Sequence, residues 1–253
     1  MKRRTFLRQS GAALLFAGQR PLRLLIATGW YDHAFLNALP CLKKMFTETG
    51  RFAVTVTEKL APPELAGQDV LLVLYNGPRW PAETEHAVER FVGSGHGMVT
   101  MHGTTYAFGG VEVRKEHFKL SGIIEKPWPE FVRMIGCRWP EEKLGHGRRH
   151  RFPVRFTDRE HPITSGLPAE LEADDELYHR ITLLPQAHVL ATAYSAPATK
   201  GTGNDEPMMW TTGYGSGRVF HTTLGHDCQA ITAPAFHRTV PRAAEWAATG
   251  AVR

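Results

Sequence analysis

MVTMHGT, residues 98–104, predicts an apolar strand that ends on His102. The same pattern recurs near the C-terminus, where a predicted strand over residues 218–223 leads into Gly-His-Asp at 225–227. In open α/β sheets the ligand crevice lies beyond the carboxyl ends of the strands. We therefore expect the chemistry of this protein at these two strand ends, because no other motif with a recognised mechanism stands out in the chain.

Apolar strands alternate with amphipathic helices on the N-terminal side of this stretch. Continuous apolar runs predict buried strands over residues 22–28 and 69–75, and a shorter alternating run predicts a strand over 52–57. Helical spacing of apolar residues predicts helices over 33–49 and 83–92. This alternation predicts an α/β fold, with a doubly wound, mostly parallel sheet flanked by helices.

Residues 109–150 lack this periodicity and are rich in Gly, Pro, Trp, His and Arg. We interpret them as a long inserted loop segment that covers the crevice. Regular structure resumes beyond it, with a closing helix over 233–248 and strands predicted at 152–156, 189–193, 208–212 and 218–223. The last two strands flank a glycine-rich turn, which predicts a β-hairpin-like pair. We expect residues 21–253 to form a single domain.

The chain has 253 residues, of which 42% are hydrophobic and 22% are charged, a composition typical of one globular α/β domain. Its net charge of +5 does not indicate nucleic-acid binding, because the basic residues are dispersed. The densest basic runs, at residues 2–4 and 148–151, are not interleaved with the aromatic side chains on which bases stack. We therefore expect no nucleic-acid partner.

The first 20 residues resemble a twin-arginine export signal. An Arg-Arg pair at 3–4 is followed by Phe-Leu at 6–7 and by a short apolar run over 11–18. That run is too short to cross a membrane as a helix, so we expect no transmembrane span. We predict a leader over residues 1–20 and a periplasmic protein. The alternative is a leader that stays on a cytoplasmic protein, since no Ala-x-Ala cleavage site precedes the first strand.

The three cysteines, Cys41, Cys137 and Cys228, show neither a C-x-x-C spacing nor an even-numbered framework. We expect each to be a small buried apolar residue rather than a nucleophile or a metal ligand. Cys228 is the one cysteine that stands close to the expected site.

Six short motifs, taken in chain order, are similar to those of a known protein family. They are MHG at 101–103, HPITSGL at 161–167, DELY at 175–178, GSGRVF at 215–220, TLGHD at 223–227 and AEWA at 244–247. The ordered set resembles the ThuA-like family, which is named for trehalose utilisation. The resemblance covers nearly the whole chain after the leader.

The resemblance implies a class I glutamine amidotransferase-like fold, with a flavodoxin-like arrangement of the sheet. In amidotransferases of this class a cysteine nucleophile occupies the turn after the strand, and a histidine follows a late strand. Here His102 occupies that turn, which excludes glutamine hydrolysis by a cysteine, and His226 matches the late histidine. The resemblance implies that the two histidines meet in one crevice. It also implies a role in carbohydrate metabolism, including the processing of keto-sugars.

The candidate catalytic residues are His102, His226, Glu176 and Tyr178. The glycine after His102 permits a tight turn that would expose the histidine, whereas the simpler alternative is a histidine hydrogen-bonded to neighbouring backbone. Asp227, beside His226, is equally consistent with a helix N-cap. The family resemblance implies a role for Glu176 and Tyr178, whose charged surroundings are otherwise typical of a solvated loop.

Two kinds of chemistry suit these residues, and the sequence leaves both open. In the first, His33, His102 and His226 bind a divalent metal such as zinc, with one position open for water or a substrate oxygen. No H-E-x-x-H or other local spacing indicates a metal, so the fold must assemble such a site. In the second, the same side chains act as general acid and base beside a sugar carbonyl without a metal.

We predict that the protein acts on a sugar or keto-sugar derivative, as an isomerase, lyase or hydrolase without a cysteine nucleophile. Its expected partner is a small-molecule carbohydrate, and a homo-oligomer is compatible with the sequence. The alternative is a non-catalytic carbohydrate-binding or accessory protein on the same fold. Polar groups that converge on one crevice would favour the enzyme. Histidines that point into the core with backbone partners would favour the alternative.

Overall fold

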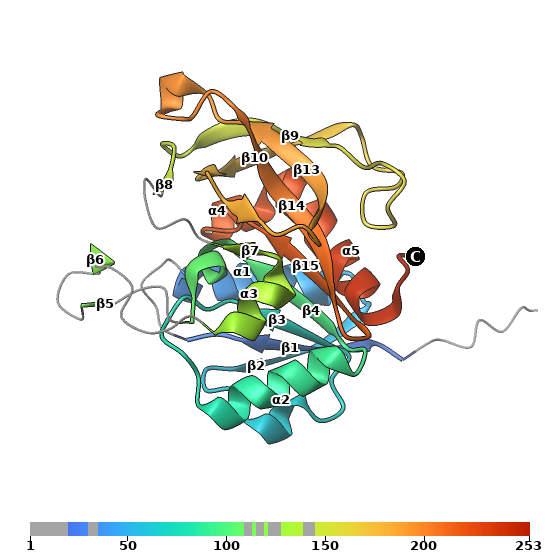
Figure 1. Ribbon diagram of the computed structural model, residues 1–253. Helices are drawn as coiled ribbons and strands as arrows, with labels where there is room; N and C mark the ends of the chain where they lie inside the picture. Colours follow the sequence, from blue (N-terminus) through green and yellow to red (C-terminus); the bar gives the residue numbers. More distant parts are fainter. Residues whose placement is uncertain (1–19, 30–34, 109–112, 115–118, 121–127, 139–144) are drawn as a thin grey trace, which may run out of the picture.

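The core of the protein is a nine-stranded β-sheet (Figure 1). The computed structural model describes residues 20–29, 35–108, 113–114, 119–120, 128–138 and 145–253. Across the sheet the strand order is β10-β9-β13-β14-β15-β4-β3-β1-β2. Neighbouring strands are often distant in the chain, and this is how remote strand ends come together.

Five parallel strands form one half of the sheet, namely β15 (Gly217–Thr222), β4 (Gly97–Met101), β3 (Val70–Val73), β1 (Leu22–Ala27) and β2 (Phe52–Thr57). β3 and β4 are buried along their whole length because helices cover both faces, which explains their unbroken apolar sequences. β4 and β15 pair from Gly97 and Arg218 to Met101 and Thr222, so their carboxyl ends lie side by side. The predicted alternation of strands and helices is confirmed.

Four antiparallel strands extend the sheet beyond β15, namely β14 (Asp205–Tyr214), β13 (His188–Tyr194), β9 (His150–Phe156) and β10 (Glu170–Asp175). β14 and β15 form the predicted hairpin, and its turn contains Gly215 at a φ of +58°, a conformation that favours glycine. The predicted fold class, a large α/β sheet flanked by helices, is confirmed. The antiparallel strands make the sheet mixed.

Helices cover both faces of the sheet (Figure 1). One face is covered by α1 (Phe35–Glu48), α4 (Cys228–Thr232) and α5 (Pro234–Thr249). The other face is covered by α2 (Ala82–Gly93) and α3 (Pro129–Ile135). Side chains alternate along each strand, so Val99 and Phe220 join the first core whereas Met98 and Val219 join the second.

Short elements complete the described part of the chain. The 3₁₀ turns are η1 (Pro62–Leu65), η2 (His102–Tyr106) and η3 (Pro197–Thr199). The two-residue strands are β5 (Val113–Arg114), β6 (Lys119–Leu120), β7 (Cys137–Arg138), β8 (Gly145–His146), β11 (Tyr178–His179) and β12 (Thr182–Leu183). The region 109–150, predicted as a long loop segment, contains α3, β7 and β8. β7 pairs with β12 and β8 with β11, which ties this region to residues 178–183.

A disulfide joins Cys41 of α1 to Cys228, the first residue of α4, with Cα atoms 5.5 Å apart. The prediction that the cysteines form no framework is therefore wrong for this pair. The sequence could not show the bond, because 187 residues separate the two cysteines and only the packing of α1 on α4 brings them together. Cys137 is buried and free, as predicted.

The predicted leader lies outside the described residues except for Arg20. Arg20 binds both carboxylate oxygens of Asp69, at 2.6 and 2.7 Å, just before β1 begins. Among the residues that the structure describes, no helix has the length and apolar character needed to cross a membrane.

Candidate active site

His102 stands at the turn that follows β4. Its backbone has a φ of +46°, a left-handed conformation that is unfavourable for a residue with a Cβ, and its side chain is fully buried. The ring Nδ1 lies 2.9 Å from the backbone oxygen of Thr223, just after β15. A carbonyl oxygen only accepts hydrogen bonds, so Nδ1 carries the hydrogen. The neutral ring therefore offers the lone pair of Nε2 as an acceptor or a ligand.

His226 lies in the loop between β15 and α4. Gly225 before it has a φ of +113°, and a Cβ at this position would lie 2.4 Å from Cε of Met101, so the turn requires glycine. Asp227 after it caps α4, because its carboxylate accepts a hydrogen bond from the N–H of Ala230. The N-cap interpretation of Asp227 is confirmed, and the cap holds the turn that carries His226.

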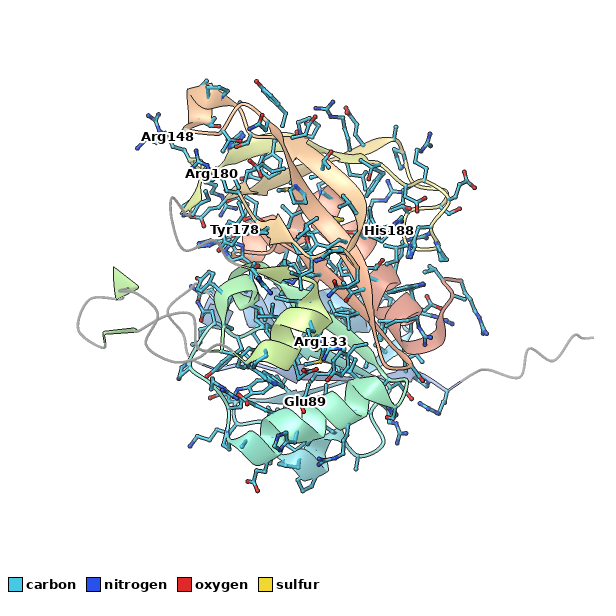
Figure 2. All side chains as sticks on the ribbon, in the orientation of Figure 1. Glu89, Arg133, Arg148, Tyr178, Arg180 and His188 are labelled. Carbon is cyan, nitrogen blue, oxygen red and sulfur yellow. A yellow bond between two sulfur atoms is a disulfide. The ribbon has the colours of Figure 1, made fainter. Side chains whose placement is uncertain are left out.

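The end of β10 brings a carboxylate to the same place. Asp175, which is 1% exposed, accepts hydrogen bonds from the N–H groups of Gly225 (2.6 Å) and Glu176 (2.8 Å). These contacts tie β10 to the loop between β15 and α4, and they place Glu176 beside His226. Two residues further on, Tyr178 lies on β11 and is 2% exposed (labelled in Figure 2).

Four side chains, His102, Glu176, Tyr178 and His226, converge on one point, and we call them the polar cluster. Nε2 of His102 lies 3.1 Å from Nδ1 of His226 and 3.1 Å from the hydroxyl oxygen of Tyr178. Oε2 of Glu176 lies 3.8 Å from Nε2 of His102 and 3.4 Å from Nδ1 of His226. On the exposed side, Nε2 of His146 lies 3.6 Å from the same carboxylate oxygen.

The surroundings shift the protonation of three groups. Burial raises the pKa of the Tyr178 hydroxyl well above its usual value, so the phenol stays protonated near neutral pH. Hydrogen bonding to Glu176 raises the pKa of His226. Burial raises the pKa of Asp175 to about 7. The hydrogen bonds from two backbone N–H groups act in the opposite direction, because they favour the charged carboxylate, but burial has the larger effect. The polar cluster thus places a neutral proton donor near a histidine that favours the cation.

Three ligand atoms of the polar cluster have the spacing of a tetrahedral face. Nε2 of His102, Nδ1 of His226 and Oε2 of Glu176 are separated by 3.1, 3.4 and 3.8 Å. Bonds of ~2.0–2.2 Å in a tetrahedral zinc site separate the ligand atoms by roughly 3.4 Å. Two imidazoles and one carboxylate suit zinc better than calcium or magnesium, which prefer oxygen ligands. The cluster can therefore hold one divalent cation.

The contact behind His102 also fits a metal ligand. Histidines that bind metals almost always donate their other ring N–H to a carbonyl, a carboxylate or water, which fixes the tautomer and the direction of the ring. The hydrogen bond from Nδ1 of His102 to the oxygen of Thr223 is such a contact. It exists in the structure independently of any ion.

All four residues predicted to be catalytic lie together in the polar cluster. Of the residues predicted to bind a metal, His102 and His226 lie within ligand distance of each other. His33, the third, lies outside the described residues. Among the described residues the third donor is Glu176, which the sequence suggested only as a catalytic group.

Three further residues lie beside the polar cluster and were not predicted to be functional. His146 lies in β8, and the pairing of β8 with β11 sets it directly opposite Tyr178. Arg149 binds Asp227 at 2.6 Å and Asp174 at 3.1 Å, and so links the α4 cap to β10. Asp175 links β10 to the same loop. His146 and Arg149 stand in the segment predicted to cover the crevice, and Asp175 is the first residue of the DELY motif, but none of these signals assigned a role to the residue itself.

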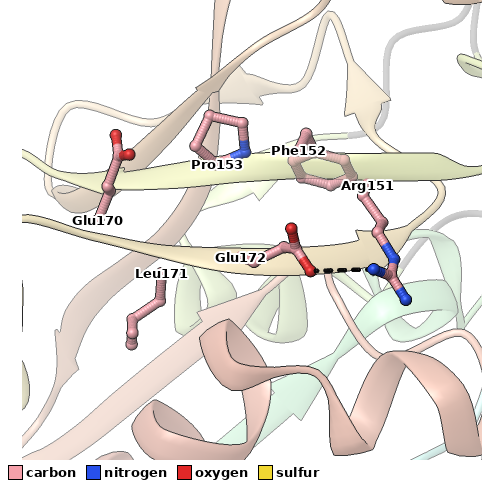
Figure 3. Close-up of a pocket in the computed structure, with 6 residues that line it drawn as sticks. All are labelled: Arg151, Phe152, Pro153, Glu170, Leu171 and Glu172. Atoms are coloured by element: carbon pink, nitrogen blue, oxygen red, sulfur yellow. Dashed lines mark ion pairs between the residues drawn. The ribbon is translucent and has the colours of Figure 1, made fainter.

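A separate shallow hollow of about 350 Å³ lies over β9 and β10 and shares no residue with the polar cluster (Figure 3). It is lined by Arg151, Phe152, Pro153, Glu170, Leu171 and Glu172. Arg151 and Glu172 form an ion pair at 3.7 Å, and both side chains are mostly exposed. Exposed ion pairs of this kind contribute little and are common on protein surfaces, so we assign no ligand to this hollow.

The sequence model of the ThuA family, described as trehalose utilisation, matches residues 23–247. A ThuA-like protein from Parabacteroides merdae is similar over 92% of both chains, with 29% identity and a TM-score of 0.78. A ThuA-like protein from Bacteroides uniformis is similar over 91% of this chain and 93% of its own, with 20% identity and a TM-score of 0.69. A β-galactosidase from Bacillus circulans sp. alkalophilus shares the fold over 88% of this chain and 31% of its own, with 13% identity and a TM-score of 0.58. No curated protein matches the chain.

Proposed function

The chain belongs to the ThuA family, described as trehalose utilisation, and we propose that it is an enzyme that acts on a sugar or keto-sugar derivative at the polar cluster. The observation that carries the proposal is the convergence of four chemically active side chains at distances between 3.1 and 3.8 Å. Groups with shifted pKa values that meet at the carboxyl ends of sheet strands are typical of catalytic sites.

His102, Glu176 and His226 would hold one divalent cation, such as zinc. The tetrahedral spacing of the three ligand atoms and their chemical types support this assignment. A cation held there would supply a Lewis acid for a substrate carbonyl oxygen.

The remaining groups move protons. The Tyr178 hydroxyl, 3.1 Å from Nε2 of His102, is kept neutral by burial and donates a proton to the carbonyl oxygen. His146, 3.6 Å from Glu176 on the exposed side, removes the proton from the carbon beside the carbonyl. Enolisation of a keto-sugar in this way leads to isomerisation or to elimination of a neighbouring substituent. Neither outcome needs a cysteine nucleophile.

Hydrogen exchange with solvent tests the proposal without knowledge of the product. A 3-keto-disaccharide is incubated with the purified protein in D₂O, and NMR follows deuterium incorporation at the carbons beside the carbonyl. We expect exchange with the wild type and a loss of about 100-fold or more in His102→Ala and Tyr178→Phe. His188→Ala is the matched control, because His188 is an exposed histidine that pairs with Asp158.

Each other outcome has a distinct meaning. Equal exchange in all four proteins would refute the assignment of the site. Binding of the sugar without exchange or product would identify a carbohydrate-binding or accessory protein instead. Exchange that persists after removal of divalent cations, checked by elemental analysis, would assign acid–base chemistry without a metal to the same residues.

We also propose that the chain is exported to the periplasm through its twin-arginine leader. Disulfides persist in oxidising compartments, so the bond between Cys41 and Cys228 supports this location. Replacement of the arginine pair at residues 3–4 by lysines should retain the protein in the cytoplasm with its thiols reduced. Full periplasmic recovery of that variant would contradict the proposal.

A further inference from the structure

A row of three hydrogen bonds runs behind His102, inside the protein. Nδ1 of His221 lies 2.5 Å from the hydroxyl of Thr100, and Nε2 of His221 lies 2.9 Å from the hydroxyl of Thr105. The Thr105 hydroxyl in turn lies 2.5 Å from the backbone oxygen of His102. All four residues are at most 4% exposed, so solvent does not compete for these contacts.

The chemistry of the groups decides which atom donates and which accepts in each hydrogen bond of the row. The oxygen of His102 can only accept, so the single proton of the Thr105 hydroxyl points to it. Thr105 must then accept from His221, which places the hydrogen of His221 on Nε2. Burial lowers the pKa of His221 to about 3, so the ring is neutral and Nδ1 is bare. The Thr100 hydroxyl therefore donates to Nδ1, and the position of every hydrogen in the row is determined.

His102, at the end of this row, has a backbone conformation that its surroundings must stabilise. His102 has a φ of +46°, and a residue with a Cβ holds a left-handed conformation only where its surroundings enforce it. The Thr105 hydroxyl binds the carbonyl of His102, and the Thr223 carbonyl, two residues after His221, binds its ring. Both ends of His102 are thus tied to the end of β15.

Two further contacts keep the row in place. The ring of Trp210 packs on His221 with centroids 4.5 Å apart, and its own N–H donates to the oxygen of Ile135. His221 and Thr100 are direct neighbours in the pairing of β15 with β4. The row therefore rests on two central strands rather than on a surface loop.

We propose that Thr105 and His221 are positioning residues, which hold the peptide of His102 in its left-handed conformation and so direct Nε2 into the polar cluster. Neither residue touches the reacting atoms. The inference rests on the proposed function only for the role of His102 as a catalytic or metal-binding group in the polar cluster. The placement of His102 itself is measurable without substrate or metal.

NMR of histidine labelled with ¹⁵N tests the geometry directly. In the wild type we expect His221 as the neutral tautomer with hydrogen on Nε2, and an exchange-protected Nδ1–H for His102. Thr105→Val removes the hydroxyl at nearly constant volume, and we expect the protected Nδ1–H of His102 to be lost. Thr105→Ser restores the hydroxyl and should restore the signal. Thr239→Val is the control, because Thr239 is a buried threonine whose hydroxyl bonds to backbone oxygens of its own helix, α5.

Zinc binding by calorimetry is the second measurement, at a temperature where every variant is folded. We expect affinity to fall about 10- to 100-fold in Thr105→Val, as for other changes behind a metal ligand, and to stay within about threefold in Thr105→Ser and Thr239→Val. An unchanged His102 signal in Thr105→Val, or hydrogen on Nδ1 of His221, would overturn the inference. If the wild type binds no zinc, the cation in the proposed function fails, and the NMR comparison still decides this inference.

Discussion

Reduction of the disulfide between Cys41 and Cys228 should destabilise the protein and loosen the turn that carries His226. The bond closes a loop across 187 residues. In the chain-entropy account, a cross-link over this length restricts the unfolded chain by about 5 kcal/mol at 25 °C, and removal of native disulfides typically costs ~2–5 kcal/mol. Cys228 directly follows Asp227, the N-cap of α4. Loss of the bond therefore also removes a constraint on the turn that holds His226 in the polar cluster.

Urea unfolding with and without dithiothreitol measures this loss as a change in the free energy of unfolding. A thiol-specific dye in denaturant checks the state of each sample. The oxidised protein should show the single free thiol of Cys137, and the reduced protein should show all three cysteines. The double variant Cys41→Ser with Cys228→Ser is the control, because dithiothreitol should not change its stability further.

Two results would refute this reasoning. If the oxidised sample lost less than ~1 kcal/mol on reduction, the loop would not restrict the unfolded chain as the entropy account requires. If protein folded under oxidising conditions showed three free thiols, the pairing itself would be wrong.

Three further predictions concern single residues. Burial lowers the pKa of His221 to about 3, so below pH ~6.5 the unfolded chain binds more protons at this residue, and His221 alone contributes a loss of stability of about 1.4 kcal/mol per pH unit; the raised pKa of Asp175 contributes in the opposite direction. Urea titrations of the wild type and His221→Gln at pH 7.5 and 5.0 measure this contribution as the difference between the two pH slopes; equal slopes in the two proteins would contradict it. Gly225→Ala would place a Cβ 2.4 Å from Met101 and 2.7 Å from Phe236 at a φ of +113°, and should cost ~2–4 kcal/mol in thermal unfolding. A wild-type melting temperature would mean that the turn adapts. Glu176→Gln should weaken zinc binding by about 100-fold with little effect on stability, because the side chain is partly exposed; unchanged affinity in calorimetry would remove Glu176 from the site.

The parallel half of the sheet was predictable from the sequence, whereas its antiparallel edge was only partly so. β3 and β4 are buried on both faces, and such strands appear as unbroken apolar runs. β10 is an edge strand that buries only alternate residues, and its sequence, ELEADD, has too few apolar side chains to be recognised. Among the nine strands of the sheet, the one that local pattern missed was therefore the strand that leads the carboxylates toward the polar cluster.

The chemistry of the candidate site was predictable in kind but not in geometry. Strand ends pointed to His102 and His226, and the family resemblance pointed to Glu176 and Tyr178. The contact of Asp175 with the N–H of Gly225, which sets Glu176 against His226, joins residues 50 apart in the chain. Periodicity and local spacing in the sequence cannot predict a contact between residues so far apart in the chain.

By itself the sequence determined the fold class, the two strand ends where chemistry is expected, and the absence of a cysteine in the turn after β4. These properties depend on the order of apolar and polar residues along short segments. Only the tertiary structure decided that Glu176 completes a tetrahedral face, that Cys41 pairs with Cys228, and that His221 supports His102. Each of these depends on distances between segments 50 to 187 positions apart, which the packing of the sheet and helices sets and local sequence does not.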